Sequence, residues 1–326
     1  MKSYKQLYQK LPAEALKLLA EQYEPPQLDQ VLAGFMRQRP ATLRVNRLKT
    51  NVRQVMETLR QENVKFNRVL WYEDALVIKN RREKDLVALK LYLEGHIYLQ
   101  SLSSMLPPLL LHPEPGSKVL DLTAAPGGKT TQLAALMANK GFLVANEINQ
   151  VRAERLKFNV SRQGASCVTV RVGDGKWLEP QWREYFDAVL LDAPCSGVGL
   201  FMLDQPQTYR GWSLRWVHQL VKEQRKLLET ALWALRPGGT LVYSTCTLTR
   251  AENEANVEWV LQRYPETVRL EPVAFNLTGA KNYQQITTIA DSNGRMLTVI
   301  PGTLYEGFFV ARFVKYHSLF RVKFME

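Results

Sequence analysis

Apolar side chains follow two patterns along the chain, and the change between them lies near Gly116. Before it, residues 12–35 carry apolar positions at helical intervals, which predicts two short helices. The later patterns predict strands at 42–46, 64–71, 75–78 and 95–100 and helices at 52–61 and 101–111, the second capped by Ser101. We expect this α+β unit to end near Asp85, and an N-terminal domain to cover residues 1–100.

After Gly116 strands and helices alternate. Strands are predicted at 118–122, 142–146, 167–172, 188–191 and 240–243, and the longest helix at 213–235, before a stop at Arg236-Pro-Gly-Gly. Such alternation predicts an α/β fold with a Rossmann-like parallel sheet and right-handed crossovers. Residues 307–312 are predicted to form a final edge strand. The second domain is expected to cover residues 101–326, with ligands outside the carboxyl ends of its strands.

The first of these strands leads into a glycine-rich turn. Residues 119–122 are mostly apolar, Ala-Ala-Pro-Gly-Gly follows, and Lys129 opens a helical pattern. This turn presents backbone N–H groups at a helix N-terminus, where an anionic or polar ligand can bind. A P-loop is excluded because Thr123 stands where its first glycine is required, and the dinucleotide fingerprint is absent.

Two acidic residues follow later strands of the same sheet. Glu147 suits the hydroxyl pair of a ribose. The alternative interpretation is a carboxylate at the start of a helix, where the helix dipole favours it. Asp174, in Gly-Asp-Gly, suits an adenine amino group or is a plain turn residue. Together with the glycine turn they indicate a nucleoside site without a need for polyphosphate. S-adenosylmethionine fits that description better than NAD or ATP.

Two cysteines also stand just beyond strand ends. Cys195 occurs in Asp192-Ala-Pro-Cys-Ser-Gly, and Cys246 occurs in Ser-Thr-Cys-Thr. A lone cysteine after a strand is usually buried and inert. Two at the ends of two strands of one sheet, with an aspartate beside them, are harder to dismiss as inert. Cys167, at the start of a predicted strand, is interpreted as inert.

Composition limits the class of protein. The 326 residues include 46% hydrophobic and 23% charged residues, as in ordinary globular proteins with ample core. Apolar runs are short and broken by proline, so no membrane span or signal peptide is expected. The three cysteines have no metal-type spacing. We expect a cytoplasmic monomer without a metal.

The net charge of +12 favours a polyanionic partner such as nucleic acid. Residues 1–112 hold 18 Lys and Arg against 11 Asp and Glu, so more than half of the excess lies in that third. The N-terminal region is therefore the better candidate for a polyanion-binding surface. Within it, the charge run 80–84 is interpreted as a solvated turn.

Six motifs are spread over nearly the whole chain, at residues 39–46, 95–105, 121–129, 192–197, 244–247 and 306–311. Together they resemble the motifs of the Sun-type RNA 5-methylcytosine methyltransferases. Pro-Cys after the fourth strand of the sheet and Thr-Cys after the fifth are the most specific. The resemblance implies a Rossmann-like methyltransferase domain preceded by a small α+β RNA-binding domain, S-adenosylmethionine as cofactor, and ribosomal or transfer RNA as substrate.

The same resemblance implies a role for each site residue. Cys246 would add its thiolate to carbon 6 of cytosine, Asp192 would hydrogen-bond ring nitrogen 3, and Cys195 would assist proton removal from carbon 5 and enzyme release. The target cytidine must lie outside any base stack to be attacked. The residues expected to hold the cofactor are Thr123, Ala124, Ala125, Pro126, Gly127, Gly128, Lys129, Glu147, Arg152, Asp174 and Asp192.

RNA recognition is expected to rest on residues 1–100, because the extra N-terminal and C-terminal modules of some relatives are not expected here. Phosphate contacts are predicted from Arg37, Arg39, Arg44 and Arg47. Two alternatives stay open. One is an RNA-binding assembly factor with a dispensable site. The other is a methyltransferase for exocyclic amines, which would need neither cysteine, although the Asn-Pro-Pro-Tyr type of motif common in such enzymes is missing from the sequence.

Overall fold

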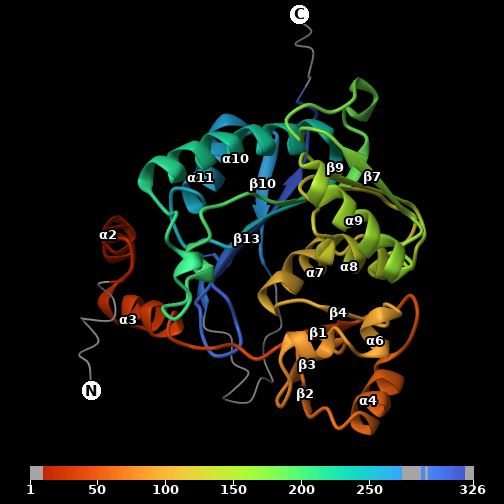
Figure 1. The fold of residues 1–326 in the computed structure, drawn as a ribbon. Helices are drawn as coiled ribbons and strands as arrows, with labels where there is room; N and C mark the ends of the chain where they lie inside the picture. The colour runs from red at the N-terminus through yellow and green to blue at the C-terminus, as the bar shows by residue number, and fades with distance from the viewer. Residues whose placement is uncertain (1–9, 274–287, 291–292, 320–326) are drawn as a thin grey trace, which may run out of the picture.

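The computed structural model describes residues 10–273, 288–290 and 293–319, arranged around two sheets (Figure 1). The smaller sheet is antiparallel, with strand order β2-β3-β1-β4. The larger sheet is mixed, with order β11-β12-β13-β9-β8-β5-β6-β7 and β10 paired to β13. The predicted α/β class with a central Rossmann-like sheet is confirmed.

The small sheet is built almost as its pattern predicts. Its β4 pairs with β1, so the expectation that the α+β unit ends near Asp85 is wrong. The sheet takes in a strand from beyond that point because its open edge at β1 needs a hydrogen-bonding partner. The elements are β1 (Thr42–Val45), α4 (Val52–Gln61), β2 (Phe66–Arg68), β3 (Ala75–Ile78), α5 (Glu83–Leu86), α6 (Lys90–Leu93) and β4 (Ile97–Leu99).

The large sheet has a parallel half, and successive side chains along its strands point into two different apolar cores. Leu120 of β5 packs on one face with α10, while the preceding Val119 packs on the other with α7, α8 and α9. The elements up to β8 are η1 (Ser103–Met105), α7 (Leu106–Leu111), β5 (Lys118–Asp121), α8 (Gly128–Leu136), β6 (Phe142–Glu147), α9 (Gln150–Gln163), β7 (Val168–Val172), η2 (Pro180–Trp182) and β8 (Phe186–Asp192).

The C-terminal half of the large sheet differs from expectation at one strand. Residues 308–312 of the predicted edge strand fall in β13, which lies between β9 and β12 and is therefore not an edge strand. Its run of buried side chains, from Phe308 to Ala311, is what a strand covered on both faces requires. The remaining elements are η3 (Val198–Leu200), η4 (Pro206–Thr208), α10 (Leu214–Ala234), β9 (Leu235–Thr245), α11 (Glu254–Arg263), β10 (Val268–Glu271), β11 (Thr288–Ala290), β12 (Met296–Val299) and β13 (Phe308–Lys315).

The first two helices of the described residues pack against the part of the molecule that contains the large sheet. Helices α2 (Ala13–Gln22) and α3 (Pro25–Gly34) share a core with Val198, Phe201 and Trp212. The small sheet is joined to the same part through a further apolar cluster that includes Val77, Met105 and Phe308. No helix in the described ranges is long and apolar enough to cross a membrane.

Candidate active site

A cavity of about 250 Å³, the cysteine cavity, opens at the carboxyl ends of β5, β6, β8 and β9. It brings together side chains that the sequence predicted to be functional, from four strand ends far apart in the chain. Its lining residues are Leu122, Thr123, Ala125, Asn146, Glu147, Ile148, Arg152, Asp174, Gly175, Asp192, Ala193, Pro194, Cys195, Glu223, Leu227 and Cys246.

A second cavity of similar size, the lysine cavity, adjoins the first and reaches the small sheet. Thr123, Ala125 and Asp192 line both cavities. Asp192 therefore lies where contents of the two cavities would meet. The lysine cavity is lined by Tyr98, Leu99, Gln100, Ser101, Ser104, Asp121, Thr123, Ala124, Ala125, Pro126, Gly128, Lys129 and Asp192.

The two cysteines are in direct contact. The Sγ atoms of Cys195 and Cys246 are 3.1 Å apart, and one thiol donates to the other sulfur. They meet because β8 and β9 are parallel neighbours in which Asp192 is paired with Ser244, so equivalent points of the two loops lie side by side. Cys167 lines neither cavity.

A buried carboxylate ties the two cysteine loops together. Glu252 accepts hydrogen bonds from the backbone N–H and the hydroxyl of Ser196, at 2.8 and 2.5 Å. The Ser196 hydroxyl is also 2.9 Å from the hydroxyl of Thr247.

The hydrogen bond with Cys246, then burial and nearby negative charge, raise the pKa of Cys195 well above its ordinary value. Cys195 therefore keeps its proton at neutral pH.

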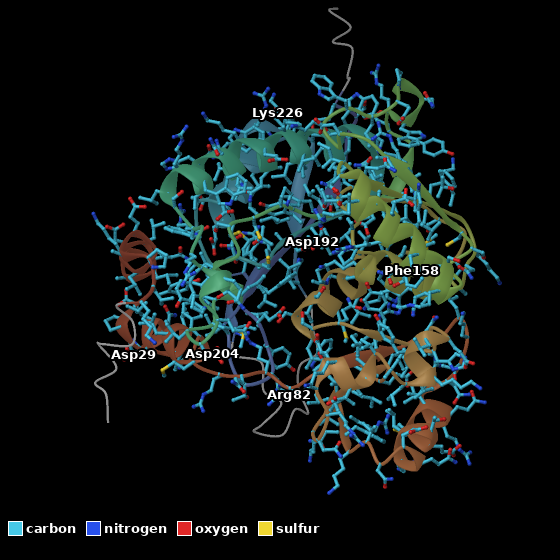
Figure 2. All side chains as sticks on the ribbon, viewed as in Figure 1. Asp29, Arg82, Phe158, Asp192, Asp204 and Lys226 are labelled. Carbon is cyan, nitrogen blue, oxygen red and sulfur yellow. The ribbon has the colours of Figure 1, made fainter. Side chains whose placement is uncertain are left out.

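Lys129 and Asp192 form the main ion pair of the site (Figure 2 labels Asp192). The ammonium is 2.6 Å from Oδ2 of Asp192, whose Oδ1 accepts from the Ser244 hydroxyl at 2.7 Å. Burial alone lowers the pKa of Lys129, but Asp192, with Cys246 and Asp121, raises it above its ordinary value. A lasting positive charge is thus held beside Cys246. Burial also raises the pKa of Asp121 to about 7.

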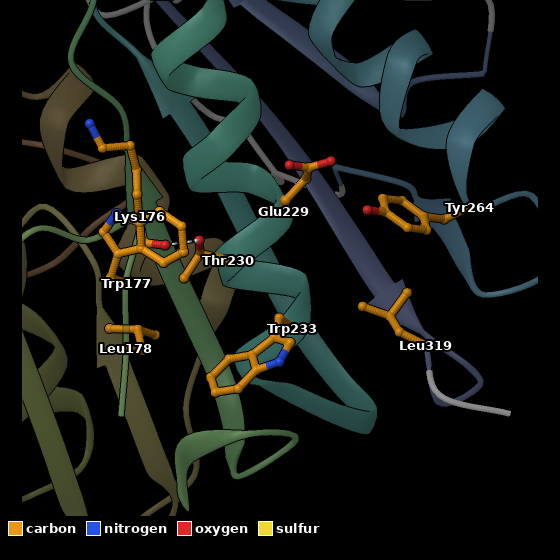
Figure 3. A pocket seen from close by; sticks show the side chains of 8 residues that line it. All are labelled: Lys176, Trp177, Leu178, Glu229, Thr230, Trp233, Tyr264 and Leu319. Carbon is orange, nitrogen blue, oxygen red and sulfur yellow. Dashed lines mark hydrogen bonds between the residues drawn. The ribbon is translucent and has the colours of Figure 1, made fainter. Parts of the chain in front are cut away.

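The far end of the cysteine cavity carries the two predicted nucleoside contacts. Glu147 is buried, accepts the Asn149 N–H at 2.9 Å and lies 3.5 Å from Arg152, which also donates to the carbonyl of Ala125 at 2.8 Å. Asp174 accepts the N–H of Lys176 at 2.9 Å. Lys176 also lines a further cavity, of about 540 Å³, together with Trp177, Trp233 and Tyr264 (Figure 3).

The lining of the cysteine cavity fits a nucleoside cofactor such as S-adenosylmethionine. Gly175 lies in this lining, where an added Cβ would stand only 3.1–3.2 Å from Leu227, Asn146 and the carbonyl of Leu122. The absence of a side chain there leaves room beside Asp174. The two carboxylates at this end can accept hydrogen bonds from hydroxyl or amino groups, as a ribose and an adenine require.

Comparison with known proteins decides the family. The family model for 16S rRNA methyltransferase RsmB/F matches residues 108–314, and the model for the ferredoxin-like domain of RsmF/B-like methyltransferases matches residues 5–83. The chain belongs to the RsmB/F methyltransferase family. This membership confirms the resemblance seen in the sequence, and S-adenosylmethionine is the cofactor of this family.

Relatives in the RsmB/F family are similar over most of this chain. The ribosomal RNA small subunit methyltransferase F of Shewanella sp. (strain ANA-3) is 39% identical over 301 residues, which cover 91% of this chain and 60% of that protein. Its counterpart in Escherichia coli O81 (strain ED1a) is 39% identical over 297 residues, 89% and 60% of the two chains. The chain thus spans about 60% of the length of these curated relatives.

Solved structures show the same fold. A methyltransferase homolog protein from Pyrococcus horikoshii is 30% identical and has a TM-score of 0.73, with 94% of this chain and 100% of that chain covered. NSun6 from Pyrococcus horikoshii, solved with SFG, has a TM-score of 0.79 at 21% identity, with 95% and 100% covered. The second likeness concerns the fold alone.

The residues predicted to hold the cofactor of this RsmB/F chain divide between the two cavities. Thr123, Ala125, Glu147, Arg152, Asp174 and Asp192 line the cysteine cavity, and Ala124, Pro126, Gly128 and Lys129 line the lysine cavity. Gly127 lines neither, and it has the positive φ of 107° that begins α8. The glycine turn therefore lies between two cavities, although the sequence predicted a single cofactor site.

The arginines predicted to contact phosphates differ in their surroundings. Arg44 is 1% exposed and donates to Gln100, Thr131 and the carbonyl of Gly128, at 2.9–3.2 Å, so its prediction as a phosphate contact is wrong. Its place in a buried strand, at the seam with α8, removes it from solvent. Nε of Arg39 donates to the carbonyl of Tyr305, and Arg47 lies 3.5 Å from Asp74. Arg37 is exposed, and its phosphate contact stays a prediction.

Sequence reasoning missed two groups of site residues. Tyr98, Gln100 and Ser104 line the lysine cavity from the small sheet and the turn after it. They lie in the 95–105 motif, but no role was predicted for them, because only the pairing of β4 with β1 brings them to the glycine turn. Glu252 was also missed. The available signal was a carboxylate six residues after Cys246, and its burial is visible only in the structure.

Proposed function

We propose that this chain is an S-adenosylmethionine-dependent RNA cytosine-5 methyltransferase that acts on small-subunit ribosomal RNA through a covalent bond between Cys246 and cytosine. The observation that carries the proposal is the contact of two thiols at 3.1 Å, at one end of a cavity whose other end suits a nucleoside. Membership in a family of 16S rRNA methyltransferases favours ribosomal over transfer RNA. The monomeric state and the cytoplasmic location stay predictions.

The target base is assigned to the junction of the two cavities at Asp192, with Cys195 and Cys246 on one side of it. On the other side, the polar lining of the lysine cavity includes Gln100, Ser104 and Lys129. Asp192 can donate a hydrogen bond to ring nitrogen 3 as a carboxylic acid, or accept one from a protonated nitrogen 3 as a carboxylate, and the Lys129 ammonium offsets negative charge that develops on the ring. The small sheet closes this cavity, which supports an RNA-binding role for residues 1–100 beside a catalytic domain of residues 101–326.

The division of labour between the cysteines follows from their contact. Cys195 holds its proton, so Cys246, beside Lys129, is the thiol that gives its proton to water and attacks carbon 6 with its electron pair. The carbon 5–carbon 6 double bond opens, and its electrons become available at carbon 5. When bound, S-adenosylmethionine supplies the methyl group that carbon 5 takes up.

Collapse of the adduct requires a base. Once Cys246 is bonded to carbon 6, both its hydrogen bond with Cys195 and its negative charge are weakened, and these are two of the causes that raise the pKa of Cys195. Cys195 can then lose its proton to water and accept the proton of carbon 5. The electrons of the broken carbon–hydrogen bond re-form the ring double bond, and the Cys246 thiolate leaves carbon 6.

A trapping assay tests this proposal. Cys195→Ala protein, 16S rRNA transcript and S-adenosylmethionine are combined and run on a denaturing gel. We expect a protein band shifted by covalently held RNA, which Cys195→Ala/Cys246→Ala protein does not give. Wild-type protein that methylates RNA while Cys195→Ala gives no shifted band would overturn the assigned role of Cys195. Cys246→Ala protein that still methylates would overturn the nucleophile.

A further inference from the structure

Exposed cations line two adjoining hollows on the small sheet. One, of about 450 Å³, is lined by Arg60, Lys65 and Lys79 with the ring of Phe66. The other, of about 620 Å³, includes Lys79, Arg81 and Arg82 in its lining. Lys79 belongs to both, so the five exposed side chains form one continuous surface, which we call the basic band: Arg60, Lys65, Lys79, Arg81 and Arg82.

Two cations of the basic band are held face to face. The N–H of Lys79 donates to the carbonyl of Lys65 at 2.8 Å, and β2 and β3 are paired antiparallel at the next residues, Phe66 and Ile78. Asn80 fixes this end by accepting the N–H of Lys65 at 2.7 Å. Like charges directly opposite each other on a sheet are destabilising. A bound polyanion would convert that repulsion into attraction.

Neutralising partners are few along this surface. Within the part of the chain that the structure describes, no carboxylate forms an ion pair with Lys65, Lys79, Arg81 or Arg82. Glu83 is the acid that lines the second hollow. Asp204, near its rim, already accepts from Gln38 at 2.9 Å. The positive charge of the basic band is therefore available to a ligand.

The basic band leads toward the catalytic centre. The second hollow is closed by Met202 and Gln205, which belong to the segment that runs on from Cys195. Figure 2 shows Arg82 on the same side of the molecule as Asp204, with Asp192 beyond them. A strand lying along the small sheet would thus reach the loop that carries a catalytic cysteine.

We propose that the basic band binds the phosphate backbone of the substrate RNA outside the two cavities. This inference rests on the proposed function, and it revises the interpretation of residues 80–84 as a solvated turn. Five cations along a groove match a polyanion, and the half-buried ring of Phe66, under Arg60, offers a surface on which a base can stack.

The test compares two triple variants with equal loss of charge. Lys79→Ser/Arg81→Ser/Arg82→Ser removes part of the basic band, and Lys118→Ser/Lys140→Ser/Arg183→Ser removes exposed cations near the amino ends of the parallel strands, at the opposite edge of the sheet. The Kd for 16S rRNA transcript is measured from about 50 to 200 mM KCl, a range over which phosphate contacts change affinity strongly. The Kd for S-adenosylmethionine serves as a check on folding.

We expect the band variant to bind RNA about tenfold more weakly and to lower the slope of log Kd against log salt by about 2, as loss of three phosphate contacts to a single strand predicts. The control variant should show a smaller loss of affinity, and both should bind S-adenosylmethionine normally. Equal RNA affinity and slope in the two variants would overturn the inference. Failure of wild-type protein to methylate any RNA would overturn the proposed function, while the binding comparison would still decide the basic band.

Discussion

Cations near the glycine turn and cations on the basic band have opposite surroundings. Lys129 has a side chain 14% exposed and bonds Asp192, and Arg44 donates three hydrogen bonds inside the protein. Lys65 and Lys79 are exposed and face each other. A buried cation is fixed by its partners and can only position or polarise what lies beside it, whereas an exposed, unpaired cation can take a ligand from solution.

The largest effect is expected on methyl transfer, from a change at Cys246 in the cysteine cavity. Cys246→Ala should reduce methyl transfer to RNA below detection, because the neighbouring Cys195 keeps its proton and cannot replace Cys246 in the attack on carbon 6, while the Kd for S-adenosylmethionine stays close to that of wild type. Cys167→Ala is the matched control and should keep its activity, since Cys167 lines neither cavity. Tritium transfer and calorimetric titration measure the two quantities. Activity in Cys246→Ala would contradict the assignment.

Loss of a buried cation should cost much more stability than loss of an exposed one. Arg44→Met would take away the donor to the side-chain oxygen of Gln100 and one of the donors to the carbonyl of Gly128, so the free energy of unfolding should fall by about 2–4 kcal/mol. Lys79→Met, on the exposed surface, should change it by about 0.5 kcal/mol or less. Urea denaturation of both variants checks this. Equal losses would show that burial does not separate the two groups of cations.

A buried acid near Lys129 should make stability depend on pH. The raised pKa of Asp121, about 7 against an ordinary 3.8, means that the folded protein binds a proton that the unfolded chain releases between those values. Stability from this group therefore falls as pH rises from about 4 to 7. Asp121→Asn lacks this loss. Its free energy of unfolding relative to that of wild type should therefore rise by about 2 kcal/mol when the pH is raised from about 5 to about 8. A constant difference in thermal denaturation at the two pH values would argue against it.

The smallest effect is expected on the basic band. Lys65→Thr removes one of two facing charges and should raise the free energy of unfolding by about 0.2–1 kcal/mol. The gain should vanish in about 1 M KCl, where charges are screened over about 3 Å. Lys140→Thr is the control. A gain that persists at high salt would assign the effect to strand propensity and not to repulsion.

The strands of the parallel half could be predicted because their signal is local. Apolar runs that stop at Leu122, Leu191 and Tyr243 mark strand ends, and parallel strands place their carboxyl ends along one edge. This is how Cys195 and Cys246 could be expected to meet. The partner of each strand is not a local property. The interior place of β13 depends on β10 and β12, whose pairing the pattern of a single strand does not contain.

The surroundings of the arginines could not be predicted either. Arg44 and Arg47 stand three residues apart in the sequence, and their side chains carry the same charge. Only the packing of β1 against α8 makes one of them 1% exposed and leaves the other open to solvent on one side. Sequence periodicity indicates which face of a strand is covered when the residues there are apolar, and a buried arginine gives the opposite signal.

The small sheet fixes the distance between the basic band and the glycine turn. Its order β2-β3-β1-β4 puts the basic band at one edge, and Arg44 and Gln100, which hold the glycine turn, toward the other. Three interstrand spacings of about 4.8 Å make a width of about 14 Å. A folded sheet of fixed width, in place of a flexible linker, would then set how far along the RNA the modified base lies from the phosphates that are gripped.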